Sequence, residues 1–251
     1  KLERKRNDTF IATALLDQGV AAGCGNLDIC QVIIDRIGVF HITNNKRYTP
    51  LHVAATHQGR LAVYKYILDI TKDKTPISGD GSTPLHWAAL SGHWNICNFI
   101  LNGTENTNPT HNDNDTPLHV AARVGHLNVC KLIVENTNHV SPSGRIGYTP
   151  LHWAAQNGHL TTVKYILEKS EETNPSDNVG DSPLHCAARS GRFDVCKYMM
   201  ETIEEKSPRN DDGESPLVMV CGGGGGGVNV GECDGDAGNC DNGGDVDGDG
   251  G

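Results

Sequence analysis

Close copies of the stretch Thr149-Pro-Leu-His-Trp-Ala-Ala-Gln-Asn-Gly158 recur along the chain, and this recurrence is the strongest indication of its fold. Thr-Pro-Leu-His begins at residues 49, 83, 116 and 149, and the variants Ser-Pro-Leu-His and Ser-Pro-Leu-Val begin at 182 and 215. Successive copies start 34, 33, 33, 33 and 33 residues apart, and an Ala-Ala pair and a glycine follow in the first five. A fixed period of this length indicates a repeat architecture.

Each repeat predicts two helices and a loop. Thr is a favoured helix N-cap, Pro suits the first helical position, and the later Gly allows a turn. A second apolar stretch, for example residues 160–167, predicts a second helix. The polar stretch that follows, for example residues 173–180, contains Pro, Asn, Asp and Gly, which favour turns and hairpins. Two short helices cannot bury their own apolar faces, so neighbouring units must stack.

This motif and its spacing closely resemble the ankyrin repeat family, whose motif is Thr-Pro-Leu-His-x-Ala-Ala at a spacing of 33 residues. The resemblance covers roughly residues 12–220. It implies an all-α ankyrin-repeat α-solenoid of antiparallel helix pairs with projecting β-hairpin loops, used for protein recognition. The family usually has Gly-Ala near the end of the second helix, whereas Ser170 and Glu171 stand here, so we expect these loops to differ from the usual hairpin.

The chain divides into an N-terminal segment (1–11), an ankyrin repeat domain (12–220) and a tail (221–251). We expect units at 16–48, 49–82, 83–115, 116–148, 149–181 and 182–214, and a truncated unit at 215–220. The first unit has Leu16-Asp-Gln-Gly19 where the motif should stand, which is typical of a degenerate capping repeat. Because the chain starts at Lys1 without a signal-like apolar stretch, we expect it to be a fragment or a processed piece.

Most of the net charge of −10 belongs to the tail. Residues 221–251 contain 14 of the 30 glycines and seven acidic residues but no Lys or Arg, which leaves −3 for the rest. This composition predicts a disordered low-complexity tail. Its last residues match the start of a calcium-binding loop but lack the later Glu ligand, so we expect no metal site there. A chain without excess Lys and Arg is a poor candidate for nucleic-acid binding.

Twelve histidines and nine cysteines raise two chemical alternatives, a metal ladder and a Cys–His nucleophile. The motif histidines occur once per layer, and packed helices lie about 8–10 Å apart, too far for several to reach one zinc ion. We therefore predict that they are structural and that the body binds no metal or other cofactor. They are His52, His86, His119, His152 and His185.

The body cysteines favour packing over catalysis. Cys97, Cys130 and Cys196 share one repeat position with Tyr64 and Val163, which is typical of an apolar core position. Each of Cys97 and Cys130 follows a histidine by four residues, but a catalytic pair should be singular and this one recurs. We predict no catalytic residue. Cysteines spread in this way suggest a reducing compartment, and hence a cytoplasmic protein.

The predicted function is a non-enzymatic scaffold or adaptor that binds another protein as a monomer. No run of 18 apolar residues exists, so we expect no membrane insertion of this segment. One alternative is the cytosolic regulatory region of a larger membrane protein such as an ion channel. Another is the ankyrin region of a multidomain enzyme.

The predicted binding surface is a ladder of variable positions on the first helices and the adjoining loop ends. The residue after each motif His and the one three later share a helical face. In the ankyrin family, matching positions line the concave groove, and Trp, Tyr and Arg are enriched at binding hot spots. The alternative is that Trp87 and Trp153 only pack between units. The predicted protein-binding residues are Tyr48, Trp87, Leu90, Asp115, Arg123, Tyr148, Trp153, Gln156, Asp181 and Arg189.

Overall fold

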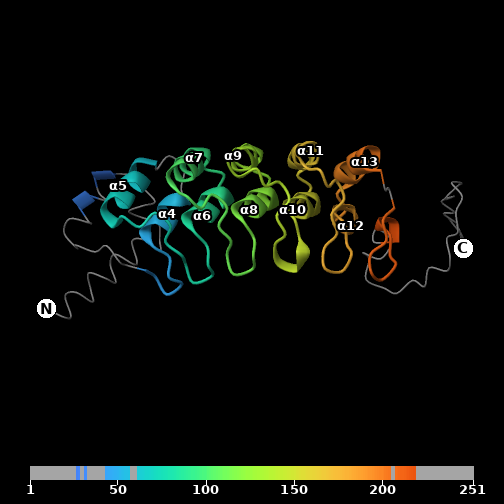
Figure 1. Ribbon diagram of the computed structural model, residues 1–251, viewed down its shortest axis with the longest axis horizontal. Coiled ribbons are helices and arrows are strands. Elements are labelled where there is room, and N and C mark those ends of the chain that lie inside the picture. Colours follow the sequence, from blue (N-terminus) through green and yellow to red (C-terminus); the bar gives the residue numbers. More distant parts are fainter. Residues whose placement is uncertain (1–26, 29–30, 33–42, 57–60, 205–206, 219–251) are drawn as a thin grey trace, which may run out of the picture.

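The computed structural model describes residues 27–28, 31–32, 43–56, 61–204 and 207–218, and it shows two rows of helices side by side (Figure 1). The inner row, from which the loops extend, consists of α4 (Pro50–Ala55), α6 (Pro84–Leu90), α8 (Pro117–Val124), α10 (Pro150–Asn157) and α12 (Pro183–Arg189). The outer row consists of α5 (Leu61–Thr71), α7 (Trp94–Gly103), α9 (Leu127–Thr137), α11 (Leu160–Lys169) and α13 (Phe193–Thr202).

This arrangement confirms the predicted all-α solenoid. The described residues contain no strand, and a single 3-10 turn, η1 (Arg145–Gly147), lies in one loop. The segment 1–11, most of the unit 16–48 and the tail 221–251 lie outside the described residues. From α4 onward, each inner helix starts one residue after a motif Thr or Ser.

The motif histidines connect each unit to the next. The backbone N–H of Thr149 donates to Nδ1 of His152 at 3.1 Å, so Nδ1 carries no proton in the neutral ring. The proton is then on Nε2, which donates to the carbonyl of Asp181 in the next unit at 3.0 Å. The same pair of contacts recurs, at Nε2–O distances of 3.0 to 3.2 Å, for His52, His86, His119 and His185. Both nitrogens of each ring are therefore used within the fold, which is the predicted structural role.

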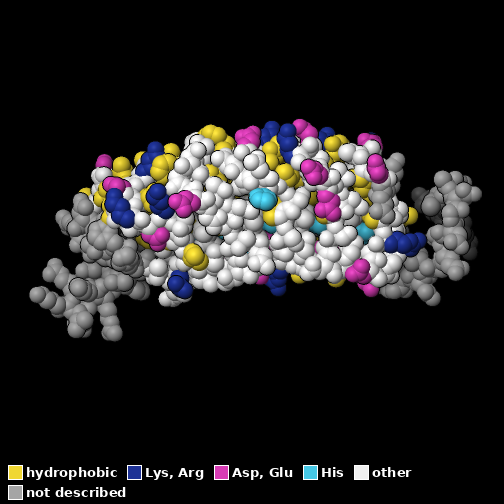
Figure 2. All heavy atoms as spheres, viewed as in Figure 1, with side chains coloured by type: hydrophobic (Ala, Val, Ile, Leu, Met, Phe, Trp, Pro, Cys, Tyr) yellow, Lys and Arg dark blue, Asp and Glu magenta, His cyan; other side chains and the backbone are white. Residues whose placement is uncertain are grey.

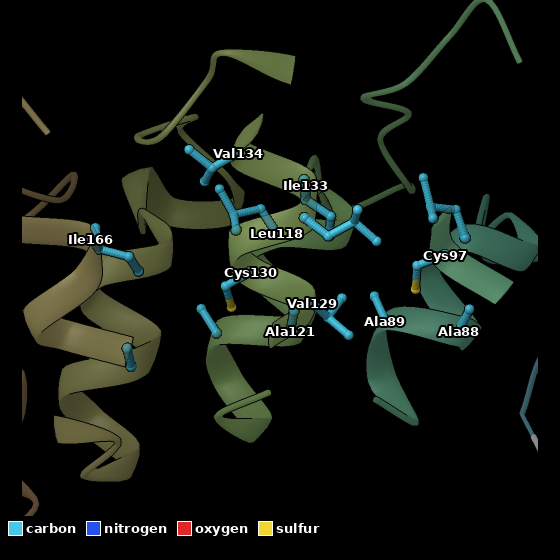
Figure 3. Close-up of a cluster of buried hydrophobic side chains, with 14 of the residues drawn as sticks. Ala88, Ala89, Cys97, Leu118, Ala121, Val129, Cys130, Ile133, Val134 and Ile166 are labelled. Carbon is cyan, nitrogen blue, oxygen red and sulfur yellow. The ribbon is translucent and has the colours of Figure 1, made fainter. Parts of the chain in front are cut away.

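The core lies between the two helix rows and runs the length of the array. Each inner helix contributes its motif Leu and at least the first Ala of its pair, and α4, α6, α8 and α10 contribute both alanines. These small residues allow the inner helices to pack closely. Cys97 and Cys130 are fully buried at the same position as Tyr64 and Val163, and Figure 3 shows both sulfur atoms within the apolar cluster. Burial raises the pKa of both thiols to about 12. The prediction that this position serves apolar packing is confirmed.

The turn between the two helices of a unit contributes a second set of contacts between units. Gly125 has φ +82, and a Cβ there would lie 2.4 Å from Nδ1 of His159 in the next unit. Nε2 of His159 lies 3.0 Å from the carbonyl of Arg123. Equivalent contacts join His126 to Leu90 and Arg192 to Gln156. The turn glycine is thus required both for its positive φ and for the room that the next side chain occupies.

The loops between described helix pairs stack on one another without forming strands. Asn210 N–H donates to the carbonyl of Glu214 at 3.0 Å, which closes its loop, and similar bonds close the others. Loops also bond to their predecessors, as Asp211 N–H does to the carbonyl of Val179 at 3.1 Å. In the described part of the chain, the projecting loops are therefore hydrogen-bonded turns rather than the β-hairpins that the family resemblance implies.

Candidate protein-binding surface

All ten residues of the predicted ladder lie on the inner helices or at the loop ends that lead into them. Six are on helices α6, α8, α10 and α12, and four directly precede the N-cap residues. We call the solvent-facing side of this row the inner face. Arg123 and Arg189 are exposed, while Tyr48, Trp87, Leu90, Trp153 and Gln156 are half-buried. The remaining three, Asp115, Tyr148 and Asp181, are 5%, 7% and 2% exposed, so they offer a partner little surface.

Two tyrosines pack against the two tryptophans of the predicted binding surface. The rings of Tyr48 and Trp87 meet edge to face with centroids 4.9 Å apart, and those of Tyr148 and Trp153 do so at 5.2 Å. Both indole N–H groups are buried and find no acceptor among the described residues, so ring contacts rather than hydrogen bonds position these side chains. Trp87 also packs against the apolar core, which supports the packing alternative for that residue. Both rings nevertheless keep part of their surface in solvent.

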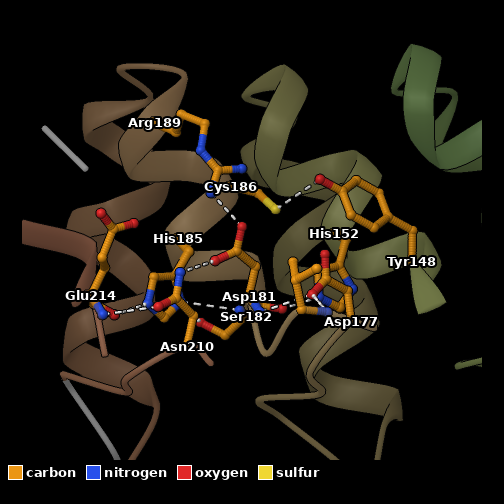
Figure 4. Close-up of polar contacts among 11 residues, drawn as sticks. Tyr148, His152, Asp177, Asp181, Ser182, His185, Cys186, Arg189, Asn210 and Glu214 are labelled. Atoms are coloured by element: carbon orange, nitrogen blue, oxygen red, sulfur yellow. Dashed lines mark hydrogen bonds and ion pairs between the residues drawn. The ribbon is translucent and has the colours of Figure 1, made fainter. Parts of the chain in front are cut away.

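A polar network fixes the inner face near α12 (Figure 4). Arg189 forms an ion pair with Asp181, whose other oxygen accepts a hydrogen bond from Asn210 at 2.9 Å. Burial alone would raise the pKa of Asp181, but the hydrogen bonds from Arg189 and Asn210 outweigh it and hold that pKa below its usual range. Cys186 Sγ donates to the Tyr148 hydroxyl at 3.5 Å. Tyr148 and Asp181 therefore act as supports that orient the exposed residues.

The equivalent network near α8 has different partners. One oxygen of Asp115 lies 3.3 Å from the backbone N–H of Arg145, and the other lies 4.0 Å from Nε2 of His111. Arg123, which follows Asp115 at the same spacing as Arg189 follows Asp181, lies instead over the ring of Trp153, with Cζ 5.5 Å from the centroid. Sequence reasoning did not separate these two arginines, and it also missed His111 and Asn210.

Several observations on the described residues bear on the metal and Cys–His alternatives. No three His, Cys, Asp or Glu side chains among them are close enough to hold a metal ion. Cys130, one half of the Cys–His alternative, is fully buried, and a thiol with a pKa of about 12 is not a thiolate at neutral pH. Its neighbour His126 bonds to the Leu90 carbonyl. None of the described helices is both long and apolar enough to span a membrane.

Comparison with known proteins agrees with the architecture. The family described as ankyrin repeats (3 copies) matches residues 69–143 and 136–210, together more than half of the chain. The chain therefore belongs to the ankyrin repeat family. It is 35% identical over 78 residues to a protein of Rickettsia bellii (strain RML369-C) that is named as an ankyrin repeat protein. The matched part is 30% of this chain and 12% of that relative, so the chain spans only a small share of the relative's length.

Proposed function

We propose that this chain is a non-enzymatic scaffold that binds another protein on its inner face. The observation that carries the proposal is the arrangement of exposed and half-buried side chains on consecutive inner helices, where Trp153 packs on buried Tyr148 and Arg189 pairs with buried Asp181. The contact residues are Tyr48, Trp87, Leu90, Arg123, Trp153, Gln156 and Arg189, and the buried residues of the ladder are Asp115, Tyr148 and Asp181.

The rigidity of the inner face favours binding. Histidine bonds join consecutive units on the loop side, and the turn contacts join them on the opposite side. A surface that is ordered before binding loses less conformational entropy when a partner arrives. An extended segment or a helix of the partner can then contact several units at once. We propose that the protein acts as a monomer in the cytoplasm, where the free thiols of Cys97, Cys130, Cys186 and Cys196 stay reduced.

A second proposal concerns the context of the array. Because the matched relative is much longer than the matched segment, this array also suits a role as the protein-binding region of a larger polypeptide. A larger membrane protein or a multidomain enzyme would fit that description. The inner face would then dock a partner, or another part of the same polypeptide, by the same contacts.

The test is selection of binding peptides from a random phage-displayed library, followed by titration calorimetry with two variants. Gln156→Arg places a bulky cation on the inner face, and Thr161→Arg places the same side chain on the exposed side of α11 in the same unit. We expect Gln156→Arg to abolish binding of the selected peptides and Thr161→Arg to leave it unchanged, with both variants melting like the parent. Equal effects of the two variants would contradict the proposal.

A further inference from the structure

The two helix rows differ in their charges. Outer helices carry both signs, for example Lys131 and Glu135 on α9, and Figure 2 shows basic and acidic side chains interleaved along that row. The five inner helices contain two residues of the Asp, Glu, Lys and Arg set, and both are arginines, Arg123 and Arg189. Any charge that the inner helices present to a partner is therefore positive.

The two arginines are not equivalent. Arg189 is bound to Asp181, and that carboxylate raises the pKa of the guanidinium even though burial lowers it. Arg123 has no carboxylate oxygen within 4.0 Å among the described residues. The nearest candidate by analogy, Asp115, is occupied by the Arg145 N–H and by His111.

Arg123 is also held in place. Its guanidinium lies over Trp153, which in turn packs edge to face on Tyr148, and Tyr148 stacks on His152 with centroids 5.1 Å apart. An arginine that rests on an aromatic ring keeps its edge open, and that edge presents a planar fork of donors that matches a carboxylate.

We propose that the partner contributes an aspartate or glutamate that docks on Arg123, next to an apolar side chain that packs on Trp153. This inference rests on the proposed function and names the chemistry of the partner: an acidic segment with an adjacent apolar anchor. A charge-assisted bidentate bond is strong where neighbouring rings exclude water, and arginine and tryptophan are residue types that dominate binding hot spots. The ring contacts order the guanidinium in advance, which reduces the entropy lost on binding.

The test uses the peptides selected by phage display against the whole chain. We expect the inner-face binders to be enriched in Asp or Glu beside an apolar residue. Arg123→Gln should weaken their binding at least tenfold, and Arg123→Lys, which keeps the charge but loses the fork, should fall between. Lys164→Gln is the matched control, because Lys164 is an exposed cation 4.8 Å from the Tyr198 ring on the outer row. It should change affinity less than twofold.

A second measurement assigns the contact to the carboxylate. Replacing the peptide's Glu by Gln should weaken its binding to the parent protein but not to the Arg123→Gln variant. The parent protein should also bind the Glu peptide more tightly than the variant does, and this difference in affinity should shrink as the salt concentration is raised. If Gln156→Arg blocks binding while Arg123→Gln and the Glu-to-Gln peptide have no effect, the inference fails and the proposed function stands. If no selected peptide responds to Gln156→Arg, both fail together.

Discussion

His119 offers the sharpest test of how the array is held together, because its ring is fully buried and each nitrogen has a different task. Nδ1 accepts from the backbone N–H of Thr116 and lies 3.0 Å from the Thr116 hydroxyl, while Nε2 donates to the carbonyl of Tyr148 in the next unit. Two substitutions separate these tasks. His119→Asn keeps an acceptor near the position of Nδ1 but cannot reach the next unit, and His119→Ala removes both functions.

The expected costs differ in size. In His119→Ala, two donors of buried Thr116 lose their acceptor, at about 1–3 kcal/mol each, so we expect a loss of about 2–6 kcal/mol of unfolding free energy. In His119→Asn, the lost bond leaves the Tyr148 carbonyl still accepting from the Gly144 N–H at 2.7 Å. That carbonyl is therefore not left without a partner, and the expected loss is about 1–2 kcal/mol.

Urea unfolding of the whole chain near neutral pH, followed by the helical circular dichroism signal, measures both losses. The slope against urea must stay unchanged for the free energies to be compared. A loss below about 1 kcal/mol for His119→Ala would refute the structural role of the ring. Equal losses for the two variants would refute the division of labour between the nitrogens.

Three further predictions concern the rest of the array. Leu151→Ala should cost about 2–5 kcal/mol in urea unfolding, whereas Leu217→Ala, at the same motif position but 71% rather than 1% exposed, should cost under about 0.5 kcal/mol; equal costs would contradict this. Gly125→Ala should lower the melting temperature far more than Gly191→Ala. Both glycines have positive φ, but a Cβ at Gly125 would meet the next unit's histidine, whereas a Cβ at Gly191 would meet nothing within 4 Å. Burial lowers the pKa of His86 to about 4, so the folded state binds fewer protons than the unfolded chain; stability should be full above about pH 6.5 and fall toward pH 4, and a flat urea midpoint over that range would contradict this.

Much of the fold could be predicted because the repeat period is written directly in the chain. The motif places each inner helix start to within one residue, since Thr and Pro encode the cap and the first turn locally. The core role of the Cys97 position followed from the interchange of Cys, Tyr and Val at equivalent places. The contacts made by His126 and His159 were missed, although the sequence shows that each of these histidines directly follows a turn glycine.

The binding surface was less predictable, because its properties depend on neighbouring units. Arg123 and Arg189 each stand eight residues after an aspartate, so sequence spacing treats them alike. In the structure Asn210 and Arg189 share Asp181, whereas Gly144 stands where an equivalent of Asn210 would be. The guanidinium of Arg123 lies instead over the ring of Trp153 in the following unit. No local pattern encodes such a difference, because it arises from side chains that meet only after stacking.

The central claim is that the inner face is the binding surface, and hydrogen exchange of the chain with and without a selected peptide tests it most directly. Bound peptide should slow exchange in α8, α10 and α12 and at the loop ends that lead into them, while α9, α11 and α13 exchange as in the free protein. Protection confined to the outer helices would contradict the claim and move the binding surface to the opposite side of the array.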